Sequence, residues 1–280
     1  MGNAMELDRA EKPLRQLRKL LMRMAKNPAP AEVHKLRTRA RKVEAIAGAL
    51  GVADERATER LLKAIKPIRK AAGAVRDMDV LAGDLLAIPR KEIDQSLVKL
   101  EEHLDATRRA SADNLTAVID AKRKKAEKHL KNFARLLDLR ANGKKPVRCA
   151  EAQRRDSETG SESRADRLMD ELTRWPVLNQ NNLHAFRLKV KELCYVLQLY
   201  PEASKRLTDA FGKVKDQIGE WHDWEQLLEI AQKVLDAQAD HDLLQHIEAT
   251  GRRKFMQALA GANTLRQRYL MGALARRAVS

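Results

Sequence analysis

Two segments of this sequence combine a histidine with cations at spacings of three and four residues. On a helix each residue advances by about 100°, so residues at these spacings fall within an arc of about 60°. In both segments an apolar stripe lies roughly 100–130° away, so the predicted helix buries one side and carries cations on the shoulder of that side. The two rows are His34, Arg37 and Arg41, and His184, Arg187 and Lys191.

Cations held in this way suit a string of phosphates. Arginine presents a planar fork that binds phosphate oxygens in pairs, and lysine supplies a mobile point charge. A neutral histidine still donates one hydrogen bond, and neighbouring anions raise its protonated fraction. A similar basic run at 122–131 is better explained as a solvated helix face. Further cations are predicted to join the two rows in binding: Lys42, Lys66, Arg69, Lys70, Arg76 and Lys215.

Three aspartates lie near the ends of predicted helices that contain glycine: Asp77, Asp79 and Asp223. They could form a catalytic carboxylate pair, but no nucleophile or metal-ligand cluster accompanies them. We expect ion pairs that orient the arginines instead. No two histidines are spaced by three or four residues, and His241 and His246 are badly phased on one helix. The sequence therefore predicts no catalytic residue, no metal site and no cofactor.

The elements that must position these residues are helices. Aromatic residues make up 4% and charged residues 34% of the 280 residues, and no stretch alternates as a strand would. A polar stretch at 141–165 loses the helical periodicity and is the predicted linker and a candidate for disorder. Pro67 predicts a kink in the third helix. Helices are expected at about 6–26, 31–50, 55–86, 90–140 (one helix or two), 166–174, 179–199, 202–236, 240–260 and 262–278.

The two halves of the chain also share sequence. Residues 66–86 can be laid on 212–231, which aligns Gly73 with Gly219, and likewise Asp77 with Asp223 and Arg69 with Lys215. The histidine segment precedes this stretch in each half. The sequence therefore predicts two helical units of the same plan, 5–140 and 166–280, joined by the linker.

The charge of the chain indicates which class of partner it binds. The net charge is +16. Residues 1–150 hold 35 Lys and Arg against 20 Asp and Glu, a net charge of +15, which leaves +1 for 151–280. This predicts a polyanionic partner attracted mainly by the first half.

The two cysteines, Cys149 and Cys194, form no CxxC motif, so no disulfide is expected. No apolar run approaches the ~20 residues of a membrane span. We expect a cytoplasmic protein.

The order H-x-x-R-x-x-x-[RK], G-x-x-R-D-x-D-V, H-x-x-R-x-x-x-K-x-x-x-Y and G-x-x-x-D resembles the CHAD family, the conserved-histidine α-helical domain. The residues that carry the resemblance are His34, Arg37, Arg41, Lys42, Gly73, Arg76, Asp77, Asp79, Val80, His184, Arg187, Lys191, Tyr195, Gly219 and Asp223. The resemblance implies two antiparallel four-helix bundles related by a pseudo-twofold, which bind inorganic polyphosphate in a basic central groove and associate with polyphosphate granules. Polyphosphate-metabolising enzymes are possible further partners. The sequence departs from the family at Glu44, Glu192 and Cys194, where arginine is frequent.

Other functions stay open at this point. The strand signature E-x-E-x-K of the triphosphate-tunnel domains often found beside this family is absent, as are P-loop spacing and H-E-x-x-H, so we expect no enzyme. Nucleic-acid binding is the stronger alternative, because polyphosphate and nucleic acids share a charged backbone. The tryptophans lie in the nearly neutral half, apart from the cations, so only weak, non-specific nucleic-acid binding at low salt is expected. A helical adaptor for protein partners is the third alternative.

Overall fold

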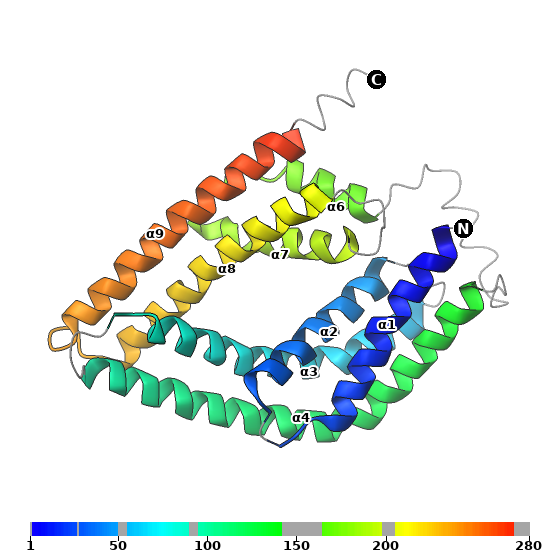
Figure 1. Cartoon of the computed structure of the whole chain (residues 1–280), viewed down its shortest axis with the longest axis horizontal. Helices are drawn as coiled ribbons and strands as arrows, with labels where there is room; N and C mark the ends of the chain where they lie inside the picture. Colours follow the sequence, from blue (N-terminus) through cyan, green and yellow to red (C-terminus); the bar gives the residue numbers. More distant parts are fainter. Residues whose placement is uncertain are drawn as a thin grey trace. The chain divides into compact units, whose positions relative to one another are not determined.

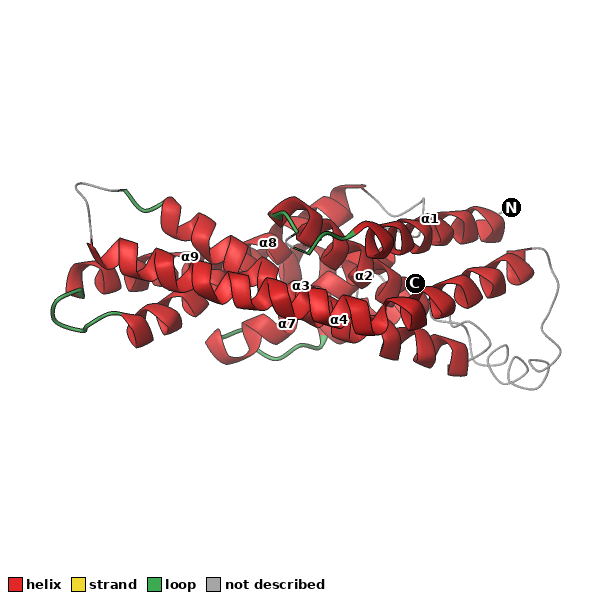
Figure 2. Ribbon diagram, turned by 90° about the horizontal axis from the view of Figure 1, so that it is seen from below, coloured by secondary structure: helices red, strands yellow, loops and turns green. Residues whose placement is uncertain are grey.

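The computed structural model describes residues 2–26, 28–49, 55–89, 95–141, 164–197 and 205–271. These residues form helices joined by short connections and contain no strand, which confirms the predicted all-α class (Figures 1 and 2). No helix in these ranges has an apolar stretch long enough to cross a bilayer. Nearly all of the predicted linker, and Cys149 with it, lies outside the described residues. The helices are α1 (Gly2–Arg23), α2 (Pro30–Ala49), α3 (Glu55–Leu86), α4 (Gln95–Ala141), α6 (Arg164–Thr173), α7 (Gln180–Leu197), α8 (Lys205–Val234), α9 (His241–Leu265) and the π-helix η1 (Arg266–Met271).

The structure bears on three of the predicted helices. Helix α3 is α-helical through Pro67, within its predicted range of 55–86, and the kink at Pro67 stays a prediction. The stretch predicted as one or two helices before the linker is the single helix α4, described from Gln95 onward. The predicted break near residue 261 is wrong, because α9 continues to Leu265 and then widens into η1. Gly261 lies inside α9, where the absence of a Cβ makes room for the side chain of Gln217 on α8.

Helices α2 and α7, which carry the two predicted rows of histidine and cations, begin with similar caps. In α7 the amide of Asn181 donates to the side chain of Asn179 (2.9 Å), and the amide of Asn179 donates to the side chain of Asn182 (2.9 Å). In α2 the amide of Ala29 donates to the carboxylate of Glu32 (3.2 Å), and Pro30 occupies the first helical position. His34 and His184 therefore lie at the same distance from the start of their helices.

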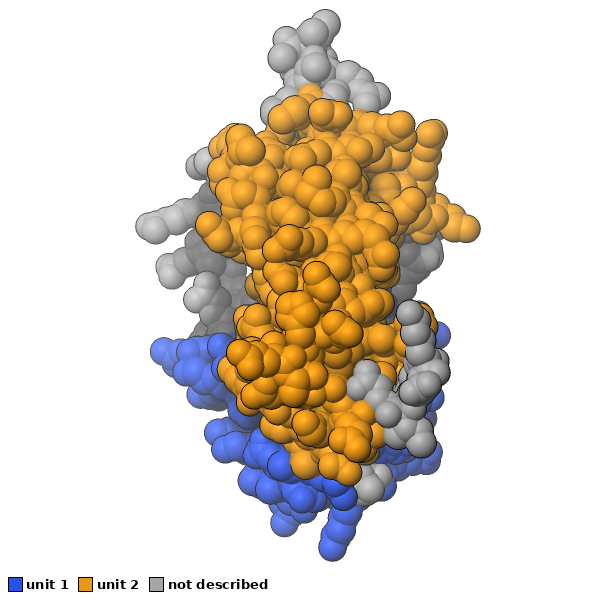
Figure 3. Space-filling view, turned by 90° about the vertical axis from the view of Figure 1, so that its left-hand side faces the viewer, with its two compact units in different colours: residues 1–76, 108–163 blue, residues 77–107, 164–280 orange. Residues whose placement is uncertain are grey.

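The chain divides into two compact units. Unit 1 comprises residues 1–76 and 108–163, and unit 2 comprises 77–107 and 164–280. In the view of Figure 3, the atoms of unit 2 form one continuous mass although they come from two separate stretches of chain. The predicted division at the linker places 77–107 with the first unit, whereas these units group it with the second. The predicted pair of related four-helix bundles stays a prediction.

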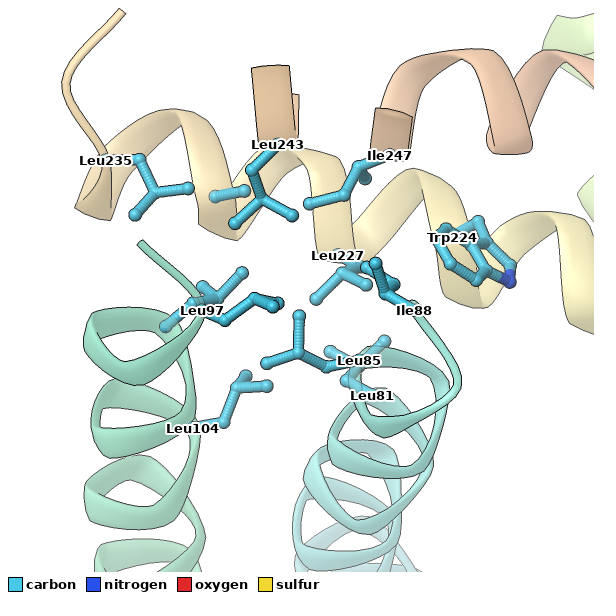
Figure 4. Packing of buried hydrophobic residues seen from close by; sticks show 12 residues of the cluster. Leu81, Leu85, Ile88, Leu97, Leu104, Trp224, Leu227, Leu235, Leu243 and Ile247 are labelled. Atoms are coloured by element: carbon cyan, nitrogen blue, oxygen red, sulfur yellow. The ribbon is translucent and has the colours of Figure 1, made fainter. Parts of the chain in front are cut away.

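A buried apolar cluster explains why 77–107 belongs to unit 2. The end of α3 and the beginning of α4 point their leucines at α8 and α9 (Figure 4). Removing one leucine side chain of this kind from water stabilises a fold by about 1.5–3 kcal/mol. The cluster contains Leu81, Leu85, Ile88, Leu97, Leu100, Leu104, Trp224, Leu227, Ala231, Leu235, Leu243 and Ile247.

The cluster predicts that two adjacent leucines of α3 differ in how much they contribute to stability. Leu85 is fully buried, whereas Leu86, the next residue of α3, is 65% exposed. We expect Leu85→Ala to lower the free energy of unfolding by about 2–5 kcal/mol, because it removes apolar contacts and leaves a cavity. Leu86→Ala should change it by no more than about 0.5 kcal/mol. Urea unfolding of both variants measures the difference, and equal effects would show that the cluster does not hold unit 2 together.

Candidate functional site

In unit 1, helices α2 and α3 meet where an arginine lies against a glycine. Gly73 of α3 is buried, and a Cβ built on it would lie 3.6 Å from Nε of Arg37 on α2. The guanidinium of Arg37 therefore passes close to the backbone of α3. Both residues belong to the motifs singled out in the sequence.

The same contact recurs in unit 2, where it is tighter. A Cβ on Gly219 of α8 would lie 2.5 Å from Nη2 of Arg187 on α7 and 3.1 Å from its Nε. The Nε–H of Arg187 donates a hydrogen bond to the carbonyl oxygen of Lys215 (3.1 Å), one turn before Gly219. The glycine is needed here because a side chain would occupy the position of the guanidinium.

Most of the predicted cations gather around these contacts, and none of them is buried. By helical phase, the predicted cations of α3 lie within an arc of about 120° centred on Gly73. Lys42 is the exception. Burial lowers its pKa, and the neighbouring charges of Arg39 and Lys12 lower it further, so it lies on the side of α2 that faces α1. Exposed members of the predicted set are His34, Lys66 and Lys70; half-buried members are Arg37, Arg41, Lys42, Arg69, Arg76, His184, Arg187, Lys191 and Lys215.

Arg69 and Lys215 are each paired with a carboxylate. Nε of Arg69 donates to Oε1 of Glu44 at 2.7 Å, and both side chains are less than a quarter exposed. Nζ of Lys215 lies 3.0 Å from Oδ1 of Asp216. The residue of α7 that corresponds to Glu44 is Cys194, and burial raises the pKa of its thiol to about 11. Unit 2 therefore has no carboxylate at the position from which Glu44 neutralises Arg69 in unit 1.

The sequence analysis missed one residue of this site, His222. Its imidazole lies against that of His184, with the ring centroids 4.0 Å apart and the rings tilted by 48°. The signal was present in the aligned repeats, since His222 follows Gly219 by three residues as Arg76 follows Gly73. Repeat alignment therefore identifies the position, but the pairing of the two rings becomes visible only in the folded chain.

The pKa values of both histidines are lowered, which favours their neutral forms. Burial lowers the pKa of His184 to about 4, and the charges of His222 and Arg187 lower it further. Burial also lowers the pKa of His222, against the opposing effect of Glu225, whose Oε2 lies 3.6 Å from its Nδ1. Glu225 is itself held by Nε2 of Gln180, at 3.0 Å.

Both aspartates of the G-x-x-R-D-x-D-V motif, Asp77 and Asp79, belong to unit 2. Residues 73–79 of α3 cross the boundary between the units, and Asp77 lies close enough to His222 to raise its pKa. That Asp77, Asp79 and Asp223 orient arginines stays a prediction. The residues that the structure describes include no group of three His, Cys, Asp or Glu arranged to hold a metal ion.

Comparisons with known proteins assign the family. The family model described as CHAD domain matches residues 9–232. The chain belongs to the CHAD domain family. A solved structure with the same fold is the crystal structure of the CHAD domain from the plant Ricinus communis, with a TM-score of 0.61 and 15% sequence identity over 95% of this chain and 90% of that chain. The curated proteins contain no match.

In this CHAD domain, the two glycines that lie against arginines, Gly73 and Gly219, give a matched pair of variants. Alanine stabilises a helix by about 1 kcal/mol relative to glycine. At Gly73 the new Cβ makes an ordinary contact, so Gly73→Ala should raise the free energy of unfolding by up to that amount. At Gly219 the Cβ displaces Arg187 from the carbonyl oxygen of Lys215, so Gly219→Ala should be less stable than Gly73→Ala by about 1–2 kcal/mol. Thermal unfolding measures both, and an equal gain would mean that the guanidinium of Arg187 is not held on α8.

The lowered pKa of His184 predicts an acid-sensitive fold. Unfolded histidine takes up a proton near pH 6.5, whereas folded His184 does so only at about pH 4. The unfolded state therefore binds more protons between these values, so stability is full above pH 6.5 and falls as the pH is lowered toward 4. His184→Gln should lose less stability over this window. Urea unfolding at pH 7 and pH 5 tests this, and identical losses in both proteins would contradict it.

Proposed function

We propose that this CHAD domain binds inorganic polyphosphate without altering it, through the cations around the two arginine–glycine contacts. The family is linked to polyphosphate binding in general, and membership in it supports the proposal. Polyphosphate is a linear chain of anionic groups. Cations repeated along helices suit such a chain better than a single deep pocket does. Association with polyphosphate granules in the cytoplasm would follow from this binding.

The observation that carries the proposal is the exposed row of cations beside the contact in unit 1. Lys66 and Lys70 are exposed one turn or more before Gly73, and no described residue forms an ion pair with either. His34 is exposed on the adjoining helix α2. Arg37 lies against the backbone of α3 at Gly73, so part of its conformational freedom is already lost before a ligand arrives. That the rows of both units face one shared groove stays a prediction.

The positions of the aromatic residues favour polyphosphate over single-stranded nucleic acid. Trp221 and Trp224 are 3% and 7% exposed. Trp175 packs edge-on against Phe186, with ring centroids 5.7 Å apart. Bases of a single strand bind by stacking on exposed aromatic rings among cations, and these rings are committed to packing. Nucleic acids are therefore expected to bind through their phosphates alone, weakly and with strong salt dependence.

Paired charge removals test the proposal. We expect the double variant Arg37→Ala, Arg41→Ala to weaken polyphosphate binding and to lower the slope of log affinity against log salt by up to about 2, because two phosphate contacts are lost. The matched control is Lys19→Ala, Arg23→Ala, which removes the same charge from exposed positions of α1. Fluorescence anisotropy with labelled long-chain polyphosphate measures both. If the two double variants lose affinity equally, net charge alone attracts the ligand.

Two further measurements complete this test. Circular dichroism shows whether the Arg37, Arg41 variant still folds, and Lys66→Ala, Lys70→Ala repeats the experiment with exposed side chains that make no described ion pair. At ~0.15 M salt, unlabelled polyphosphate should displace labelled RNA far better than RNA displaces labelled polyphosphate. Equal displacement in both directions would favour a general polyanion-binding protein.

A further inference from the structure

The α8 face of unit 2 carries less charge than the corresponding α3 face of unit 1. Each face is centred on the glycine that lies against the arginine of the neighbouring helix. Around Gly73 the face carries four cations, whereas around Gly219 the one remaining lysine is balanced by its neighbour. The corresponding pairs are Lys66 and Gly212, Arg69 and Lys215, Lys70 and Asp216, and Arg76 and His222.

At the last of these positions unit 2 has a group that can become a cation. His222 replaces an arginine and lies against His184, the histidine of the first motif of unit 2. Nδ1 of each ring is buried and has no hydrogen-bond partner. The second nitrogen of each ring would become an additional donor on protonation. The pair thus combines two titratable rings in a place where the other unit has a permanent charge.

The surroundings of the pair favour neutral rings until an anion arrives. On α7 the charges of Arg187 and Lys191 oppose protonation of His184, whereas Glu225 on α8 favours it. Asp77, from the end of α3, and Glu225 favour protonation of His222, and Arg187 opposes it. Burial disfavours the charged form of both rings. A phosphate bound beside the rings adds negative charge, which favours their protonated forms.

We propose that the His184–His222 pair is the phosphate-binding position of unit 2, with His222 as an additional binding residue, and that it binds phosphate groups of a polyanion with uptake of a proton. This inference rests on the proposed function. A proton on His222 turns its 3.6 Å approach to Glu225 into an ion pair, while the other ring nitrogen donates to a phosphate oxygen. Unit 1 binds at any neutral pH through arginine and lysine, and unit 2 adds its contribution as the pH falls.

Proton uptake has a direct thermodynamic signature. If binding takes up one proton, the logarithm of the association constant rises by up to about 1 for each unit that the pH is lowered. The terminal groups of polyphosphate also titrate, but they do so equally for every variant of the protein. The difference in slope between variants therefore isolates the contribution of the histidine pair.

The experiment measures long-chain polyphosphate affinity between pH 8.5 and 6.0 at constant salt, for the full chain and three variants. His222→Gln should gain less affinity than the unchanged protein as the pH is lowered, so the difference between the two should be largest at pH 6.0. His222→Arg, which copies Arg76, should bind several-fold more tightly at pH 8.5 and depend less on pH. His246→Gln, an exposed histidine of α9 outside the site, should leave the slope unchanged.

A second readout keeps the test independent of how well the variants fold. Calorimetric titration of the unchanged protein in buffers of different ionisation enthalpy counts the protons taken up, and NMR of the imidazole signals shows which rings change state. Uptake that disappears in His222→Gln supports the inference. Polyphosphate binding with the same proton uptake in His222→Gln would overturn it while leaving the proposed function intact. Absence of polyphosphate binding by the unchanged protein at every pH would overturn the proposed function itself.

Discussion

The contact of an arginine with a glycine on the neighbouring helix is the constraint on which both candidate sites depend. Arg37 lies on Gly73 in unit 1, and Arg187 lies on Gly219 in unit 2. An arginine free in solvent samples many rotamers, and fixing it costs conformational entropy when a ligand binds. In both units part of that cost is met during folding, because the guanidinium already lies against a helix backbone. In unit 2 the close approach requires that the receiving residue lack a side chain, whereas in unit 1 a Cβ would make only an ordinary contact.

The two units share this framework but differ in how charge is arranged around it. In unit 1 a carboxylate, Glu44, neutralises Arg69, while the exposed side chains of Lys66 and Lys70 keep their charge available. In unit 2 the position of Glu44 is occupied by an uncharged thiol, and the lysines are replaced by glycine and aspartate. The same helix geometry can therefore present a permanent positive face in one unit and a nearly neutral, titratable face in the other. Because electrostatic attraction follows the exposed charge, the first unit should dominate the capture of a polyanion.

Helix α3 explains how one motif can serve two units. Gly73 and Arg76 lie in unit 1, but the aspartates that follow in the same motif lie in unit 2, where the end of α3 packs in the apolar cluster with α8 and α9. Asp77 consequently acts on the electrostatics of His222, a residue of the second repeat. Linear order along the chain therefore does not separate the residues of one site from those of the other.

Much of the fold was determined by the sequence alone. The helical periodicity and the approximate starts of α2 and α7 follow from local rules: spacing on a helix and capping side chains. The contact of each histidine-bearing row with a glycine on the next helix does not follow from such rules. The continuation of α9 through Gly261 was not predicted, and there packing against Gln217 of α8 outweighs the local preference of glycine for a helix end. Three features were decided only by the tertiary structure: the grouping of 77–107 with unit 2, the ion pair of Glu44 with Arg69, and the contact between the rings of His184 and His222. Each joins residues distant in sequence, and burial and charge at such positions depend on neighbours that periodicity along one helix does not reveal.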